Sequence, residues 1–181
     1  MKYDQTIITP KGLAVHIRNG VASDGSAVLE NFNLTHAETD YLLSYPDENH
    51  FDAEQESRYL EKKAASPNEI ELIAFVDGKV AGTAGIDAIG AQYKVMHRAE
   101  FGISILKEYW GLGIGRALME ACIQCAKTAG YAQLELEVVA ENARAISMYR
   151  TAGFVEYGRN PKGFRSRNAG YQELISMRLE L

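Results

Sequence analysis

The sequence predicts one mixed α/β domain that spans residues 1–181. Two observations predict this fold class. Short runs that alternate apolar and polar residues, as half-buried strands do, are interspersed with segments of helical period. Near the middle of the chain, Asp77-Gly78 separates two apolar runs, which is a strong hairpin signal. No internal repeat, low-complexity tract or linker divides the chain, so we expect helices packed on one central sheet.

The first third of the chain predicts one strand and two helices. The alternation in LAVHIR indicates a first strand over 13–18, and Ser23 and Asp24 are candidate N-caps for the helix that follows. The elements expected after the strand are a helix over about 26–36, an irregular aromatic and acidic segment over 39–51, and a second helix over 52–66.

The remaining two thirds predict strands interrupted by two more helices. In the first of these helices Leu118, Cys122 and Ala126 recur every four residues and are expected to face the sheet. The expected elements are hairpin strands over 70–76 and 79–89, a strand over about 95–106, a helix over 113–129 ended by Gly130, a strand over 132–139, a short helix from Asn142 to Gly153, and strands over 154–159 and 172–179 separated by a basic loop, 158–170. The predicted order is β-α-α-β-β-β-α-β-α-β-β.

Composition excludes several classes of function. The net charge of −5 argues against a nucleic acid partner, because binding to phosphates usually needs a basic surface. No apolar run reaches the roughly 20 residues that span a bilayer, and the first residues lack a signal-peptide core, so we expect no membrane association and a cytoplasmic protein. Cys122 and Cys125 fall inside a predicted helix, which favours buried thiols over a redox or zinc site. The scattered histidines predict no metal centre.

The stretch from Ile103 to Ala117, ISILKEYWGLGIGRA, predicts a binding site for a phosphate-bearing ligand. Its glycines expose backbone N–H groups in front of a helix, whose first turn adds unpaired donors and the positive end of its dipole. A P-loop is excluded because Gly115 is followed by Arg116 and not by lysine. A dinucleotide fold is disfavoured because its third glycine would stand at position 116.

Two motifs in this region resemble the GCN5-related N-acetyltransferase (GNAT) family. Gly113 and Gly115 match the glycines of the family's core motif at the end of a strand, where Trp110 stands in the place of the usual Gln or Arg. The second motif is Asn142-x-x-Ala145-x-x-x-Tyr149-x-x-x-Gly153-Phe154. The resemblance covers about 100–154 and implies a GNAT fold and an enzyme that moves an acetyl group from acetyl-CoA directly to an amine, with no metal.

The resemblance also implies which residues hold acetyl-CoA. The backbone from the glycine loop would bind the pyrophosphate, the strand before it would pair with the pantetheine amides, and the helix cap would contact the same arm. Arg116 or Lys107 would supply the charge that Trp110 lacks. The expected cofactor-binding residues are Ile103, Ile105, Trp110, Gly111, Leu112, Gly113, Ile114, Gly115, Arg116 and Asn142.

Glu100 and Tyr149 are the candidate catalytic residues. By the resemblance, Glu100 would be the base that takes the amine proton, directly or through water, although a solvated strand carboxylate is the other interpretation. A bulge near Gly102, common in this family, would change which way Glu100 faces. Tyr149 would donate a proton to the leaving CoA sulfur, or it would simply pack the last helix.

The acceptor is not identified by the sequence. In this family it is contacted mainly by the connection of the first two helices and by the last hairpin, here 41–51 and 158–170. The first is aromatic and acidic and suits a cation, while the second carries four basic residues. A small amine and a protein amino group both remain open, as does a homodimer. The second hypothesis for function is an acyl-CoA-binding sensor without efficient transfer.

Overall fold

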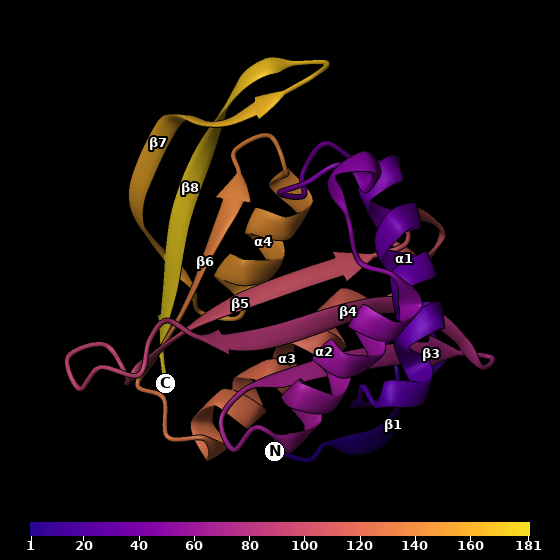
Figure 1. The fold of residues 1–181 in the computed structure, drawn as a ribbon. Coiled ribbons are helices and arrows are strands. Elements are labelled where there is room, and N and C mark those ends of the chain that lie inside the picture. The colour runs from indigo at the N-terminus through magenta and orange to yellow at the C-terminus, as the bar shows by residue number, and fades with distance from the viewer.

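An eight-stranded mixed sheet runs through the computed structural model, which describes residues 1–181 (Figure 1). The strand order across the sheet is β1-β2-β3-β4-β5-β6-β8-β7, and only β5 and β6 are parallel. The strands are β1 (Asp4–Ile8), β2 (Ala14–Asn19), β3 (Ile70–Val76), β4 (Lys79–Ala88), β5 (Arg98–Ile105), β6 (Gln133–Val139), β7 (Val155–Ser166) and β8 (Gly170–Glu180). The helices are α1 (Gly25–Glu38), α2 (Ala53–Ala65), α3 (Ile114–Thr128) and α4 (Ala143–Thr151), with single 3-10 turns at Ala22–Asp24, Pro46–Glu48 and Lys107–Tyr109.

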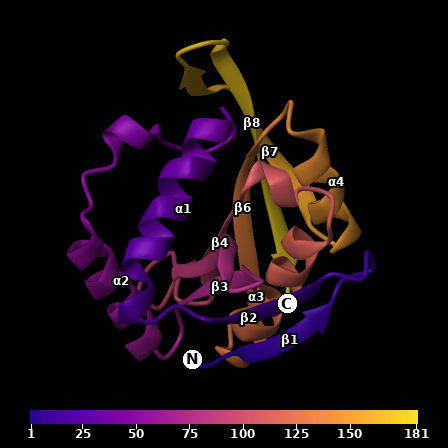
Figure 2. The ribbon, with the colours of Figure 1, turned by 90° about the vertical axis from the view of Figure 1, so that its right-hand side faces the viewer.

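The helices cover both faces of the sheet (Figure 2). On one face, Ile73 of β3 packs against Val28 of α1 and Leu60 of α2 in a small cluster. On the other face, α3 lies on the sheet and buries Leu118 and Cys122 completely in the main core. The predicted apolar stripe of α3 is thereby confirmed, and the fold is the mixed α/β arrangement that the sequence predicted.

Local capping explains where α2 and α3 begin and end. The Asp52 carboxylate accepts from the backbone N of Gln55 at 2.8 Å, and the Gln55 side chain accepts from the backbone N of Asp52 at 2.9 Å. This reciprocal capping box fixes the predicted start of α2. Gly130 follows α3 with φ +82°, a conformation that glycine adopts without a Cβ clash.

The predicted order of elements needs one correction, because β1 precedes the strand that we expected to be first. β1 pairs antiparallel with β2, from Asp4 opposite Arg18 to Ile8 opposite Ala14. Its side chains are exposed or half-buried, so no buried apolar face marks it in the sequence. Backbone pairing at the edge of the sheet holds it.

Two local predictions differ in part from the structure. Asp24 is the N-cap residue of α1, as predicted, but its side chain makes no capping hydrogen bond: it accepts from the backbone N of Val21 and is paired with Arg18 at 2.7 Å. The predicted loop over 158–170 is mostly strand, because β7 continues to Ser166 and turns only at 167–169. Its polar residues pair with β8 through a register irregularity between Asn160 and Phe164.

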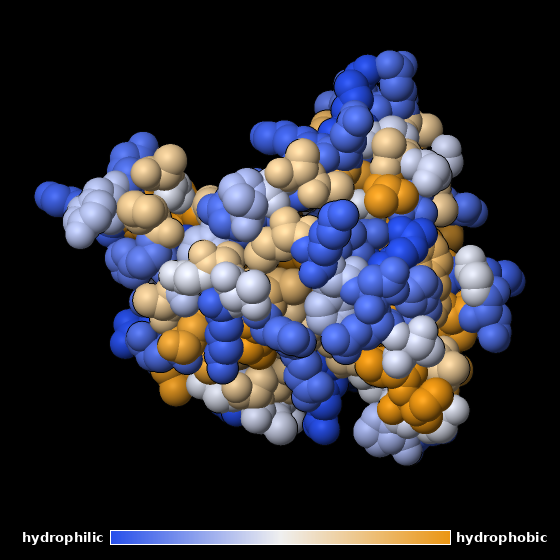
Figure 3. All heavy atoms as spheres, turned by 90° about the horizontal axis from the view of Figure 1, so that it is seen from below, coloured by the Kyte–Doolittle hydropathy of each residue, from blue (hydrophilic) through white to orange (hydrophobic).

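The surface is mixed in character (Figure 3), and both cysteines are buried. Seen from below, hydrophobic residues form small patches between hydrophilic ones (Figure 3). None of the helices combines the length and the apolar character that a membrane crossing requires. Cys122 and Cys125 are free and buried, and burial raises the pKa of both thiols, which keeps them protonated.

Candidate active site

The site is built where the parallel strands β5 and β6 separate. They pair only through Arg98, Ala99 and Glu100, opposite 133–135, and then fan apart (Figure 1). On its other side β5 stays paired with β4 over its whole length, from Ala99 opposite Ala88 to Ile105 opposite Gly82. Beyond Glu100, one edge of β5 therefore has no neighbouring strand.

The free edge of β5 carries the backbone groups of Ile103 and Ile105. The hydrogen bonds that close the β4–β5 ladder run from Ile89 N to Arg98 O and from Leu106 N to Ala81 O. Even-numbered residues of β5 thus direct their N–H and C=O groups to β4, and odd-numbered residues direct theirs to the free edge. This is the arrangement that a ligand with amide groups needs to pair like an added strand.

The glycine loop follows directly at the end of this edge. Gly111 and Gly113 have φ of +77° and +94°, so the backbone turns in a way that other residues rarely adopt. Gly113 is the N-cap residue of α3, and its side-chain-free cap leaves the first N–H groups of the helix open. A Cβ at Gly115 would lie 3.3 Å from Met148 Sδ, so glycine lets α4 approach closely. The loop presents unpaired donors at the positive end of the α3 dipole.

Trp110 links the glycine loop to β5, and two cationic side chains lie close to its ring. Its indole Nε1 donates to the carbonyl oxygen of Ile105 at 2.8 Å, so that carbonyl is already used within the chain. The guanidinium of Arg144 lies 4.8 Å from the Trp110 ring centre, and Lys107 Nζ lies 5.6 Å from it. Exposed Arg116 lies in the first turn of α3. The positive charge beside the loop thus includes Arg144, which the sequence analysis missed.

Glu100 lies in a row of three carboxylates that crosses three strands. It stands opposite Asp87 on β4 and opposite Glu135 on β6. Asp87 is paired with buried Lys63. Glu135 is paired with Arg98, which donates from Nη2 to Oε2 at 2.7 Å. Glu100 has no ion pair, and partial burial raises its pKa, helped by the negative charges of Asp87, Glu137 and Glu135.

The face of β5 that carries Glu100 is open beside α1 and α2. The register of β4 and β5 is continuous through Gly102, so the expected bulge is absent from this pairing. Glu100, Gly102 and Ser104 therefore share one face, the same face as Ile73, which packs on α1 and α2. A Cβ added at Gly102 would meet no atom within 4 Å. The face that carries Glu100 is therefore open at Gly102.

Asn142 and Tyr149 both lie on α4, as predicted. The Asn142 Oδ1 accepts from the backbone N of Ala145 at 3.3 Å, which confirms its role as N-cap. The Tyr149 ring is buried against Phe101, edge-on at 6.2 Å, and against Phe154. Tyr149 is only 6% exposed, and its hydroxyl has no hydrogen-bond partner within the protein. Burial raises the Tyr149 pKa, which keeps the hydroxyl protonated.

The two segments expected to contact an acceptor bind each other. Arg167, at the tip of the β7–β8 hairpin, donates from Nη1 to Asp47 at 2.8 Å, and its guanidinium lies 4.2 Å from the Tyr45 ring centre. The cation that suits the aromatic and acidic segment is therefore one of the chain's own arginines.

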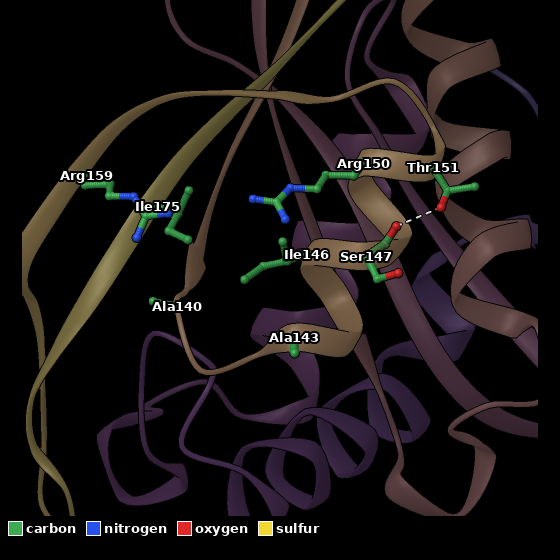
Figure 4. Close-up of a pocket in the computed structure, with 8 residues that line it drawn as sticks. All are labelled: Ala140, Ala143, Ile146, Ser147, Arg150, Thr151, Arg159 and Ile175. Carbon is green, nitrogen blue, oxygen red and sulfur yellow. Dashed lines mark hydrogen bonds between the residues drawn. The ribbon is translucent and has the colours of Figure 1, made fainter.

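A cavity on one side of α4 is lined by none of these residues. It has a volume of about 600 Å³ between α4 and the strands β7 and β8, and Arg150 and Arg159 extend into it from opposite sides (Figure 4). Both arginines are paired with Glu156. No predicted site residue lines this cavity.

The geometry thus joins three parts along one strand: an anion-binding loop at its end, a free backbone edge, and a face with one unpaired carboxylate. A model of the acetyltransferase (GNAT) family matches residues 34–154. The chain belongs to the GNAT family. This confirms the expected fold and the expected class of enzyme, an acyltransferase that uses acetyl-CoA.

The relatives of this chain differ in the acceptors that their names give. The L-amino acid N-acetyltransferase AaaT of Escherichia coli K12 is 32% identical over 118 residues, which is 65% of this chain and 72% of AaaT.

A second relative is matched over a shorter stretch, in this chain and in the relative alike. The [ribosomal protein bS18]-alanine N-acetyltransferase of Escherichia coli K12 is 45% identical over 56 residues, 31% of this chain and 38% of the relative. Among solved structures, a GNAT acetyltransferase from Streptococcus pneumoniae superposes with a TM-score of 0.88 at 30% identity, over 92% of this chain and 99% of that chain. The yncA structure from Salmonella typhimurium, solved with its cofactor acetyl-CoA, has a TM-score of 0.81 at 20% identity, covering 92% and 94%, and shares the fold.

Proposed function

We propose that residues 1–181 form one N-acetyltransferase domain that transfers an acetyl group from acetyl-CoA directly to a primary amine while both are bound. The observation that carries this proposal is the construction of β5. One edge of the strand offers free backbone groups at Ile103 and Ile105, and its adjacent face offers the unpaired carboxylate of Glu100. Donor and acceptor would therefore meet across a single strand.

The residues present fit acetyl-CoA, which supplies the acetyl group as a thioester. The N–H groups from Gly111 to Arg116, with Leu112 and Ile114 among them, would hold the pyrophosphate, and Arg144 and Lys107 beside Trp110 would add positive charge. The free groups of Ile103 and the N–H of Ile105 would pair with the pantetheine amides. Because Trp110 occupies the Ile105 carbonyl, only the N–H of Ile105 remains available to the cofactor, and a backbone N–H of this edge is the candidate donor to the acetyl oxygen.

Glu100 would take the proton from the amine. A lysine-like amine has a pKa near 10.4, so its neutral form costs about 4–5 kcal/mol at pH 7. The α-amino group of a peptide, with a pKa of about 8, costs only about 1 kcal/mol. The named acceptors of the relatives are an amino acid and a protein alanine, which supports an α-amino acceptor. The negative row around Glu100 would attract this amine as a cation and then accept its proton.

Tyr149 would stabilise the leaving thiolate of CoA by donating a hydrogen bond. Its hydroxyl is unpaired and protonated, while a thiol has a pKa near 8.5. Because the pKa of Tyr149 is raised above that of the thiol, complete proton transfer would be uphill, and donation of a hydrogen bond is the consistent role.

The test is release of free thiol from acetyl-CoA with a panel of acceptors: L-amino acids, polyamines, aminoglycosides and peptides with an N-terminal alanine. We expect thiol release that depends on an amine acceptor. If acetyl-CoA raises the melting temperature but no acceptor releases thiol, the chain is an acyl-CoA-binding sensor and the proposed transfer is wrong.

A further inference from the structure

The tip of the β7–β8 hairpin is fastened to the connection between α1 and α2. We call this set of contacts the latch; it joins 166–168 to 40–48. Asp40 accepts from Ser166 Oγ at 2.9 Å, and the Tyr45 hydroxyl accepts from the backbone N of Arg167 at 2.8 Å. Tyr45 in turn donates to Asp40 at 3.0 Å. Neither segment is close to the other in sequence, so the latch forms only in the folded chain.

Arg167 adds the charged part of the latch. Its guanidinium stacks on Tyr45 and donates to Asp47, and it reaches Glu48 at 3.5 Å. Exposed ion pairs contribute little one at a time. Here they lie next in sequence to Ser166, which is only 7% exposed and whose hydrogen bond to Asp40 is partly buried.

The latch runs from the β7–β8 hairpin to the segment that follows α1, the helix that packs on the face of the sheet carrying Glu100. The end of α1 is fixed at the end of β5, because Glu38 accepts from the backbone N of Lys107 at 2.7 Å. The open face of β5 at Gly102 thus has α1 on one side and the β6–β8–β7 part of the sheet on the other. The hairpin arches across toward the end of α1 (Figure 2). A cavity of about 360 Å³ lies between the end of α1 and the latch, and its lining includes His36, Asp40, Tyr45 and Arg167.

We propose that the latch closes the acceptor side of the cleft, so that the chain acetylates small free amines and excludes the amino terminus of a polypeptide. This inference rests on the proposed function. A peptide bound by its first residue must continue out of the cleft as an extended chain, with side chains on both faces of its backbone. Here hydrogen bonds of 2.8–2.9 Å tie the two segments together, so such a chain could pass between them only if the latch opened. A free amino acid or a small amine needs no such exit.

The test compares Arg167→Ala with the wild type. The acceptors are free L-alanine and other small amines on one side, and a peptide of about ten residues with N-terminal alanine on the other. We expect the wild type to prefer the small acceptors by at least tenfold in kcat/KM. Arg167→Ala should raise kcat/KM for the peptide at least tenfold, while kcat/KM for the small acceptors stays within threefold.

Two further variants serve as controls. Arg159 lies on the same hairpin but pairs with Glu156 and Glu173, outside the latch. Arg159→Ala should therefore leave the preference for small acceptors unchanged. Arg167→Lys keeps the charge without the forked geometry and should give an intermediate gain. Hydrogen exchange should quicken at 40–48 and 166–168 in Arg167→Ala and not in Arg159→Ala.

The inference is overturned if the wild type acetylates the peptide as well as it acetylates the small amines. It is also overturned if Arg167→Ala loosens 40–48 by hydrogen exchange without any gain for the peptide. If no acceptor of either kind releases thiol, the proposed function itself fails, and this inference fails with it.

Discussion

Glu100 differs from its neighbours in one respect: it is the member of the carboxylate row without a cation. Lys63 neutralises Asp87 and Arg98 neutralises Glu135, so Glu100 has a negative residue on each side and no ion pair of its own. Both the neighbouring charges and partial burial favour the protonated form. A carboxylate in this position is a better proton acceptor than an ordinary exposed glutamate.

Glu100→Gln tests this at the residue scale. Because the base is needed most when the amine is protonated, the variant should lose about 10²-fold or more in kcat at pH 7 and recover part of it at pH 9–10. Steady-state rates across this pH range measure the effect. An equal loss at every pH would contradict a role as base.

The acid limb of the pH profile gives a finer test. Activity should fall as the pH drops through the raised pKa of Glu100, since the protonated carboxyl cannot accept a proton. Glu137→Gln removes a nearby negative charge whose other contact is a hydrogen bond from Ser176. This variant should move the acid limb to lower pH with little loss of maximal rate. If the fall in activity at low pH does not move, it does not reflect the titration of Glu100.

Tyr149→Phe separates the catalytic from the packing role of Tyr149. The ring contacts with Phe101 and Phe154 are kept, so the fold should be unchanged. Without the hydroxyl we expect kcat to fall about 10–100-fold, while the KM for acetyl-CoA stays within about twofold. Tyr171→Phe, at an exposed tyrosine, is the control. Equal turnover in Tyr149→Phe would remove the hydroxyl from the mechanism.

The glycines, Asn142 and Tyr149 were predictable because each belongs to a local motif whose spacing is visible in the sequence. Arg144 was not, since only the packing of α4 against the glycine loop brings it over Trp110. The pairing of Asp47 with Arg167 was equally hidden. Each segment showed its own charge in the sequence, but the complementarity of the two depends on the fold.

At the scale of single elements, the loop between β5 and α3 depends on the backbone of Gly113. Its φ of +94° is costly for any residue with a Cβ, and that Cβ would also lie 3.1 Å from Thr9. Gly113→Ala should therefore destabilise the fold by about 2 kcal/mol. For a chain of this size, that lowers the melting temperature by roughly 4–8 °C.

Gly78→Ala provides the comparison for Gly113. Gly78 also has a positive φ, +77°, but an added Cβ would meet nothing within 4 Å. Gly78→Ala should therefore lose less stability than Gly113→Ala, and the difference between the two measures the crowding at Thr9. If the two variants unfold at the same temperature, the contact with Thr9 contributes nothing.

Which elements could be predicted follows from what stabilises them. Elements that bury apolar side chains show it in the sequence: α3 as a helical period, and the β3–β4 hairpin as two apolar runs around Asp77-Gly78. β1 and the outer half of β7 are edge strands whose side chains are mostly exposed, so backbone pairing defines them more than burial does. Side-chain patterns carry little information about such strands.

At the scale of the whole molecule, Glu71 makes the stability of the fold depend on pH. It lies on β3 under α2, and burial raises its pKa to about 7. An unfolded chain would hold the same group at its ordinary value of about 4.5. The folded state therefore binds the proton more tightly, so stability falls as pH rises from about 4.5 to 7.

Glu71→Gln should remove this dependence. The neutral amide needs no proton, so the variant should gain about 3 kcal/mol on the wild type between pH 4.5 and pH 7 and keep that gain above it. Denaturant unfolding at several pH values measures it. Glu61→Gln, at an exposed position on α2, should follow the wild type. Parallel curves for Glu71→Gln and the wild type would refute the assignment.

The free edge of β5 also bears on self-association. An unpaired strand edge offers its donors and acceptors to any extended backbone, including that of a second copy of the chain. A bound pantetheine arm would occupy the same groups of Ile103 and Ile105. The acetyl donor would then act as a protective cap on the sheet, so the chain should stay dispersed on heating and concentration longer with acetyl-CoA than without it.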